Sequence, residues 1–143
     1  METNGKQKKS TQEFRTDLNE AELAYFEAMI INKKQETLNE LEYLMGSLEE
    51  MRSADDDDAS SIDHHMSDVG SIEESVDLTN RLIERNRKFI KELDRALERI
   101  ENGTYGICRA TGKPIEKGRL EFAPHTRYSI AAKNSGLDKS VIA

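Results

Sequence analysis

The feature that most constrains the fold is a pair of long apolar stripes separated by an acidic stretch without periodicity. The first stripe runs from Leu23 to Met51 and the second from Ile72 to Ile100, in steps of three and four residues. Apolar residues at this spacing lie on one face of an α-helix. Because each stripe must be buried, the two helices fold back on each other. We therefore predict a mostly α protein with a long antiparallel coiled-coil hairpin over residues 18–102.

Capping signals mark the ends of both predicted helices. Asn19, with a glutamate three residues later, forms a capping box and predicts the start of the first helix, whose periodicity ends near Arg52. Ser71 forms a second capping box, which predicts the start of the second helix. The pair Asn102-Gly103 predicts its end, because glycine takes the left-handed conformation that satisfies the last helical carbonyls.

Four further segments follow from composition. Residues 1–17 are rich in Lys, Gln, Ser and Thr, so we expect a flexible N-terminal arm, and residues 134–143 are expected to form a flexible tail. Residues 53–70 carry aspartates and no periodicity, which predicts an acidic tip between the helices. Residues 103–133 concentrate glycine, proline and aromatic side chains. This C-terminal knuckle is predicted to contain tight turns, short strands and a short terminal helix.

Composition and charge exclude several classes of protein. The chain of 143 residues is 36% hydrophobic, 6% aromatic and 34% charged, which favours long solvated helices over one compact globule. Its net charge of -7 argues against tight sequence-independent DNA binding, because neutralising phosphates requires a concentrated basic surface, and we expect no direct sequence-specific DNA binding. Its apolar runs are too short for a membrane span or a signal peptide, and the single Cys108 excludes an intramolecular disulfide. We expect a cytoplasmic protein that acts on a protein partner.

The knuckle carries the spacing of a four-cysteine zinc ribbon with most of its ligands replaced. Cys108 and Thr111 form one pair of positions, and Ser129 and Ala132 form the other. Structural zinc sites use four thiolates or imidazoles, of which only Cys108 remains, so we expect no metal here. We expect apolar packing to hold the knuckle together instead. The residues predicted to form this core are Tyr105, Ile107, Ile115, Leu120, Phe122, Tyr128 and Ile130.

These segments resemble a known family. The run Ala96–Cys108, followed by Thr111–Ile115 and Arg119-Leu120, resembles the zinc-finger region of the DksA/TraR transcription regulators in both order and spacing. The segment Leu18–Phe26 is similar to the one that opens the first hairpin helix in that family. The likeness covers Leu18–Lys133, and the loss of three of the four cysteines resembles a cysteine-poor, Bacteroidetes-type branch with a degenerate C4 zinc finger.

The resemblance implies a mechanism. In this family the hairpin enters the secondary channel of RNA polymerase, where acidic residues at its tip modulate transcription initiation. Alignment without gaps places the family's tip motif Asp-x-x-Asp-x-Ala on His65, Asp68 and Gly70, of which only Asp68 matches. Asp63, or one of the aspartates at 55–58, is a candidate for the other carboxylate, so the predicted partner-binding tip comprises Asp63, Asp68 and Gly70. The alternative is that the acidic run only keeps an exposed turn soluble.

A basic stretch on the second helix gives a second set of candidate contacts. Arg85, Arg87, Lys88 and Lys91 follow one another closely, and the resemblance implies polymerase contacts or a guanosine tetraphosphate site shared with polymerase. A solvated helix face explains the same charges. Glu92 stands where the family resemblance predicts a lysine, which argues against the nucleotide interpretation.

A structural or adaptor coiled coil that dimerises or scaffolds another protein is the alternative function. Apolar residues at Met29, Ile31, Leu78 and Phe89 either pack on the knuckle or mark an oligomer interface, so we expect a monomer or a weak homo-oligomer. We expect no enzymatic activity, because the sequence contains no Ser/His/Asp, Cys/His or glycine-rich phosphate-binding arrangement.

Overall fold

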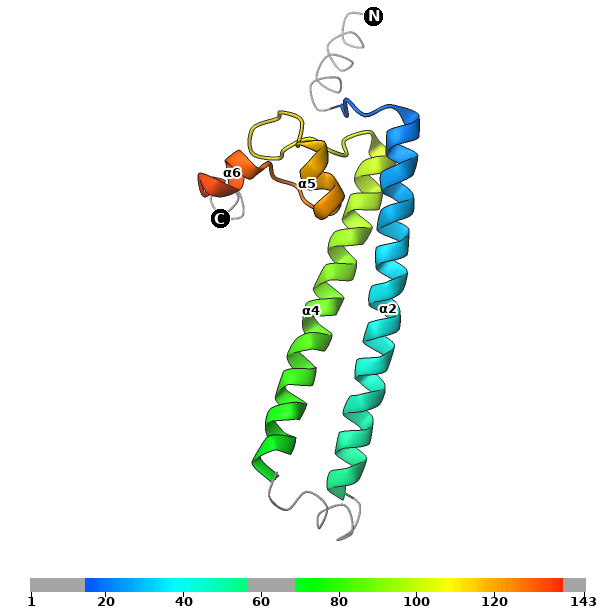
Figure 1. The fold of residues 1–143 in the computed structure, drawn as a ribbon, viewed down its shortest axis with the longest axis vertical. Coiled ribbons are helices and arrows are strands. Elements are labelled where there is room, and N and C mark those ends of the chain that lie inside the picture. Colours follow the sequence, from blue (N-terminus) through cyan, green and yellow to red (C-terminus); the bar gives the residue numbers. More distant parts are fainter. Residues whose placement is uncertain (1–14, 57–68, 138–143) are drawn as a thin grey trace, which may run out of the picture. The chain divides into compact units, whose positions relative to one another are not determined.

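The computed structural model describes residues 15–56 and 69–137 (Figure 1). Its helices are α2 (Glu20–Asp56), α4 (Val69–Asn102), α5 (Lys117–Phe122) and α6 (Ile130–Asn134). The predicted mostly α fold and the short terminal helix are confirmed. The predicted short strands are wrong, because within the described ranges β pairing is limited to an isolated antiparallel bridge between Ile107 and Pro114. None of the helices in those ranges combines the length and the hydropathy that crossing a bilayer requires.

The chain divides into two compact units. The knuckle unit comprises Met1–Lys33 and Glu92–Ala143, and the coil unit comprises Lys34–Lys91. Helices α2 and α4 contribute residues to both units, whereas α5 and α6 belong to the knuckle unit alone.

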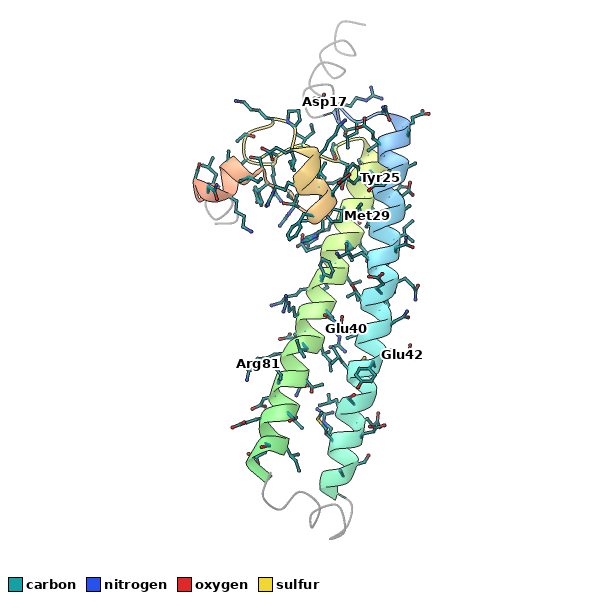
Figure 2. All side chains as sticks on the ribbon, in the orientation of Figure 1. Asp17, Tyr25, Met29, Glu40, Glu42 and Arg81 are labelled. Atoms are coloured by element: carbon teal, nitrogen blue, oxygen red, sulfur yellow. The ribbon has the colours of Figure 1, made fainter. Side chains whose placement is uncertain are left out.

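The coil unit is an antiparallel pair of helices. Leu44 and Leu48 of α2 pack with Ile83 of α4, and half-buried leucines and a valine surround them. Met51, near the end of α2, lines the same cavity as Ile72, near the start of α4, so the two helices run in opposite directions. This pairing confirms the predicted hairpin. Charged side chains such as those of Glu42 and Arg81 are exposed along its helices (Figure 2).

Two of the predicted helix ends are confirmed by their hydrogen bonds. The Asn19 side chain accepts a hydrogen bond from the Glu22 backbone N–H at 2.8 Å, and the Glu22 carboxylate accepts one from the Asn19 N–H at 3.2 Å. At the end of α4, Gly103 has a φ of 76° and the Thr104 N–H donates to the Arg99 carbonyl at 2.9 Å. The first arrangement is a capping box and the second is a Schellman motif.

The other two helix ends differ from their predictions. Helix α2 continues past Arg52 to Asp56, and α4 begins at Val69, so Ser71 lies inside the first turn and is not its N-cap. The reason is tertiary: Ala54 and Met51 line a cavity shared with α4, and such packing extends helices beyond their local signals. The tip candidates Asp63, His65 and Asp68 lie outside the described residues, and Gly70 is helical. The boundaries predicted from composition for the N-terminal arm, the acidic tip, the knuckle and the C-terminal tail stay predictions.

The knuckle unit has a fully enclosed core. Ile30 of α2, Leu93 of α4 and Leu120 of α5 have no exposed surface, and neither does Tyr105. The Tyr105 ring lies 5.7 Å from the ring of Phe26, and its hydroxyl donates to the Pro124 carbonyl at 2.8 Å. The knuckle therefore closes over the ends of the two long helices within this unit.

The predicted knuckle core is correct in part. Tyr105, Ile115, Leu120 and Tyr128 are buried and Ile107 is half-buried. The prediction is wrong for Phe122 and Ile130, because their side chains are 87% and 48% exposed. Helices α5 and α6 are so short that each fully buries one residue, Leu120 and Ala132 respectively, and Phe122 and Ile130 lie on their exposed sides.

The four apolar residues considered for an oligomer interface fall into two classes. Met29 and Phe89 are half-buried, whereas Ile31 and Leu78 are 49% and 54% exposed. Packing within the protein thus covers part of Met29 and Phe89, whereas Ile31 and Leu78 stay accessible to solvent.

Candidate functional site

The four zinc-ribbon positions come together in the knuckle. Cys108 follows the bridge residue Ile107 and is 1% exposed, and its Sγ accepts a hydrogen bond from the Ser129 N–H at 3.4 Å. The Ser129 Oγ in turn accepts from the Ala132 N–H at 3.2 Å and caps α6. Thr111 also donates to the Cys108 sulfur. The sequence spacing therefore identified a real three-dimensional cluster.

This cluster does not fit a zinc ion. Zinc in structural sites needs four thiolate or imidazole donors in a tetrahedron. Ser129 Oγ already accepts a backbone hydrogen bond, Ala132 has no donor atom, and the hydroxyl of Thr111 is a poor ligand. Across the part of the chain that the structure describes, no group of three or more His, Cys, Asp or Glu side chains could hold a metal ion.

Hydrogen bonds stabilise the sulfur in place of metal ligation. Burial raises the pKa of the Cys108 thiol, but hydrogen bonds from the Thr111 side chain and from the backbone and side chain of Ser129 outweigh it and lower the pKa to about 7. A substantial fraction of Cys108 is therefore thiolate near neutral pH. The residues that replaced the zinc ligands favour the same charge state of the sulfur that a metal would favour.

Two arginines that local patterns do not single out hold the knuckle to its helices. The Arg119 guanidinium of α5 donates to the Tyr128 carbonyl at 2.6 Å and to the Thr126 hydroxyl at 3.1 Å. The Arg99 guanidinium of α4 donates to the His125 carbonyl at 3.1 Å. Because the Arg119 and Arg99 side chains bond to carbonyls 9 and 26 residues away, beyond the reach of local patterns, only the tertiary structure reveals their role.

This chain is similar to known proteins over most of its length. Residues 103–135 match the prokaryotic dksA/traR C4-type zinc finger. The RNA polymerase-binding transcription factor DksA of Caulobacter vibrioides is 33% identical over 116 residues, which are 81% of this chain and 76% of that protein. The chain belongs to the DksA/TraR family.

Further relatives agree with the family assignment. The RNA polymerase-binding transcription factor DksA of Escherichia coli K12 is 27% identical over 117 residues, covering 81% of this chain and 72% of that protein. The solved structure of transcription factor DksA2 from Pseudomonas aeruginosa has a TM-score of 0.72 and 30% identity, covering 87% of this chain and 89% of that chain. The fold is therefore that of a DksA-type protein over nearly its full length.

The basic residues proposed as DksA-like contacts lie on α4 in the coil unit. Arg85, Arg87, Lys88 and Lys91 are all exposed, and Arg87 lines a surface cavity. Glu92 belongs to the knuckle unit and lies 3.2 Å from the Arg95 guanidinium and 3.8 Å from that of Arg127. The glutamate at the position where a lysine was expected thus has arginine partners of its own.

Proposed function

We propose that this chain binds bacterial RNA polymerase through the secondary channel and modulates transcription initiation as a DksA-type regulator. The observation that carries the proposal is the 33% identity, over 81% of the chain, to a relative named for RNA polymerase binding. A regulator of this type acts in the cytoplasm, where polymerase works, and is not an enzyme.

The construction of the coil unit suits insertion into a narrow channel. Its core is a single row of side chains, including Leu44, Leu48 and Ile83, with no third element over it in the described part of the unit. An α-helix with its side chains is about 10–12 Å across, so a pair forms a slender rod. Carboxylates at the end of such a rod can compete for a metal ion or for basic polymerase side chains. Asp63, Asp68 and Gly70 are the residues that we assign to this tip.

The exposed basic residues of α4 are the second part of the proposal. We assign Arg85, Arg87, Lys88 and Lys91 to contacts with polymerase or with guanosine tetraphosphate at its surface. Their exposure leaves the guanidinium and ammonium groups available to phosphate or carboxylate partners. We also propose that the protein acts without zinc, because the four ribbon positions do not supply a tetrahedral ligand set.

Polymerase binding and promoter output test the proposal together. The wild-type protein and a double variant, Asp63→Asn with Asp68→Asn, are compared for binding to polymerase from the same source and for transcription from its promoters. We expect both proteins to bind and only the wild type to change output. A matched control, Glu40→Gln with Glu42→Gln, removes the same charge from exposed positions of the coil unit and should leave output unchanged.

Two results would contradict the proposal. Absence of binding by the wild type would exclude the family mechanism for this chain. Equal loss of output in the tip variant and in the control would show that net acidity, and not the tip, is what matters.

An adaptor coiled coil is the second candidate, and exposed apolar side chains favour it. Leu78 and Tyr43 of the coil unit are 54% and 73% exposed. Sedimentation velocity of the wild type and of Leu78→Ser tests the dimerising form of this candidate, which requires self-association that the substitution weakens.

A further inference from the structure

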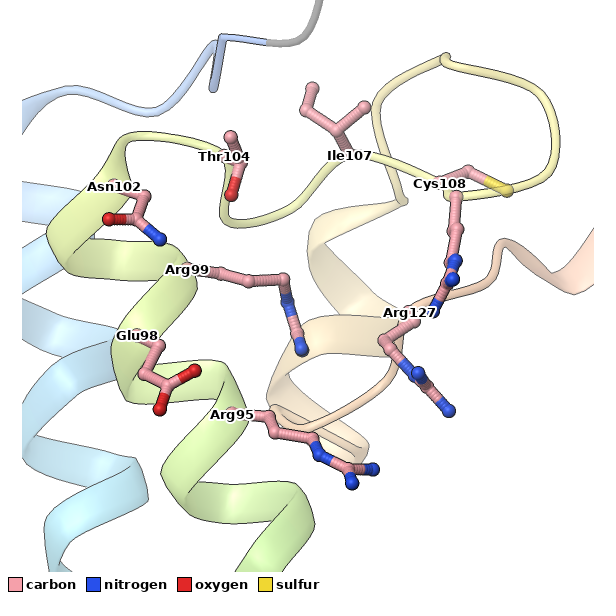
Figure 3. Close-up of a pocket in the computed structure, with 9 residues that line it drawn as sticks. Arg95, Glu98, Arg99, Asn102, Thr104, Ile107, Cys108 and Arg127 are labelled. Atoms are coloured by element: carbon pink, nitrogen blue, oxygen red, sulfur yellow. The ribbon is translucent and has the colours of Figure 1, made fainter.

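The knuckle unit contains a cavity of about 590 Å³ that is lined by four arginines. Arg95 and Arg99 come from α4, Arg109 follows the cysteine of the former zinc position, and Arg127 precedes α6. Figure 3 shows the side chains of Arg95 and Arg99 extending from α4 towards the side of the pocket where Arg127 lies. Folding of the knuckle thus gathers four guanidinium groups that are dispersed in the sequence.

The pocket is positively charged although the protein is acidic. The only carboxylate among its lining residues is Glu98, so four arginines and one glutamate give a formal charge of +3, against -7 for the whole chain. Glu92, which is not part of the lining, lies beside Arg95 and Arg127. Including Glu92 leaves a charge of +2, and ionisation of the Cys108 thiol, which also lines the pocket, lowers the charge to +1, so the nearby acids do not neutralise the site.

The arginines are held close enough to repel one another. The Arg109 backbone N–H donates to the Arg127 carbonyl at 2.8 Å, which keeps these two residues adjacent across the knuckle. Burial lowers the pKa of Arg99, and the positive charges of Arg127 and, to a smaller degree, Arg109 lower it further against the opposing effects of Tyr105 and Glu92. For the Arg109 side chain, no ion-pair partner is found among the described residues. A bound anion would relieve this repulsion.

The number of donors indicates the kind of anion. A guanidinium presents a planar fork that pairs with two oxygens of a phosphate, so two arginines can saturate one phosphate group. Four arginines therefore fit two linked phosphates better than one. The volume lies within the range of about 300–1,000 Å³ that is typical of small-molecule sites. We infer that this pocket binds a small anion that carries a diphosphate group, either inorganic pyrophosphate or the diphosphate of a nucleotide.

This site is separate from the contacts assigned to the proposed function. None of Arg85, Arg87, Lys88 or Lys91 lines it, and those residues belong to the coil unit. The inference requires no polymerase, so its failure and the failure of the proposed function are distinguishable. Arg109 and Arg127 flank the former zinc-ligand positions, which places the anion site beside the cluster around Cys108.

Calorimetric titration of the full chain with inorganic pyrophosphate tests the inference. Arg109→Gln should weaken binding by at least about tenfold, because it removes charge-assisted hydrogen bonds to the phosphate oxygens. Arg81→Gln, an exposed position in the coil unit, removes the same charge and should leave the affinity unchanged. Since the Arg109 side chain is exposed, the variant should keep the wild-type thermal transition, which circular dichroism checks.

Parallel titrations distinguish the source of the diphosphate. Guanosine and adenosine diphosphate that bind more tightly than pyrophosphate would identify a nucleotide as the ligand, whereas equal affinities would identify the free anion. Absence of heat with millimolar pyrophosphate and with both nucleotides would overturn the inference. Equal weakening by Arg109→Gln and Arg81→Gln would also overturn it, because binding would then reflect diffuse charge.

Discussion

The knuckle unit and the coil unit use the same two long helices but bury their side chains to different degrees. In the knuckle unit Ile30, Leu93 and Leu120 are completely enclosed, whereas the best-buried residues of the coil unit core, Ile83 and Leu48, are 5% and 8% exposed. The coil unit also buries polar residues, including Asn86. Two helices cannot surround a side chain on all sides, and a third segment can. The comparison shows that enclosure in this protein comes from the knuckle.

The two units also satisfy their buried polar groups differently. In the knuckle unit the Tyr105 hydroxyl, the Arg119 guanidinium and the Cys108 sulfur have hydrogen-bond partners, whereas the buried Tyr128 hydroxyl has none among the described residues. In the coil unit Thr79 donates to the carbonyl of Ser75, but the side-chain nitrogen of Asn86 has no partner among the described residues. The hydrogen bonds of these buried side chains therefore span long sequence distances in the knuckle unit and one helical turn in the coil unit, and both units leave a buried polar atom without a described partner.

The largest effect is expected from removing the aromatic centre of the knuckle unit. Tyr105→Ala should lower the free energy of unfolding by about 4 kcal/mol, because it creates a cavity beside Phe26 and deletes the hydrogen bond to Pro124. Urea denaturation measures the loss. Phe122→Ala is the control, since that side chain is 87% exposed and its removal should change stability by less than about 0.5 kcal/mol. A similar decrease in the free energy of unfolding in both variants would contradict the difference between the enclosed Tyr105 and the exposed Phe122.

A smaller effect is expected from the titration of Cys108. Its pKa is about 7 in the folded protein against a reference of 9.0, so folding favours the thiolate. The resulting stabilisation is fully present above the unfolded pKa and is lost as the pH falls through about 7. We expect the free energy of unfolding to decrease by about 2 kcal/mol between about pH 9.5 and pH 6 from this group. Chemical denaturation at a series of pH values measures the difference between wild type and Cys108→Ala.

The alanine variant provides the control for that prediction. In Cys108→Ala the free energy of unfolding should no longer show this decrease between about pH 9.5 and pH 6. In the wild type, the same change of pH should alter the hydrogen-exchange rates of knuckle amides more than those of coil-unit amides. An identical pH dependence in wild type and variant would show that hydrogen bonding to the sulfur does not contribute.

The smallest effect is expected in the coil unit. Asn86→Leu should raise the free energy of unfolding by about 1 kcal/mol, because it removes a buried amide nitrogen without a described partner and adds apolar contact. Asn80→Leu, at an exposed position on the same helix, should have little effect on thermal unfolding. Destabilisation by Asn86→Leu would mean that the amide is satisfied in solution. Sedimentation checks the oligomeric state, since a buried asparagine can specify coiled-coil pairing.

Local signals predicted the elements that local chemistry controls. Asn19 and Gly103 mark helix ends correctly, because a capping side chain and a left-handed glycine act within a few residues. The predicted helix ends at Arg52 and Ser71 are wrong. Helix α2 continues to Asp56 and α4 begins at Val69, because the two helices pack against each other. Phe122 was wrong as a core residue, since apolar character does not reveal which side of a one- or two-turn helix faces inward.

By itself, the sequence determined the helical hairpin, the family and the incomplete zinc ligand set. Periodicity, caps and ligand identity are properties of the chain's own residues, and they can be read without coordinates. Only the tertiary structure decided which knuckle side chains are enclosed, how Cys108 is hydrogen-bonded, and that Arg109 and Arg127 share a pocket with two arginines of α4. These features depend on distances between residues that are remote in sequence, and such distances exist only once the chain is folded.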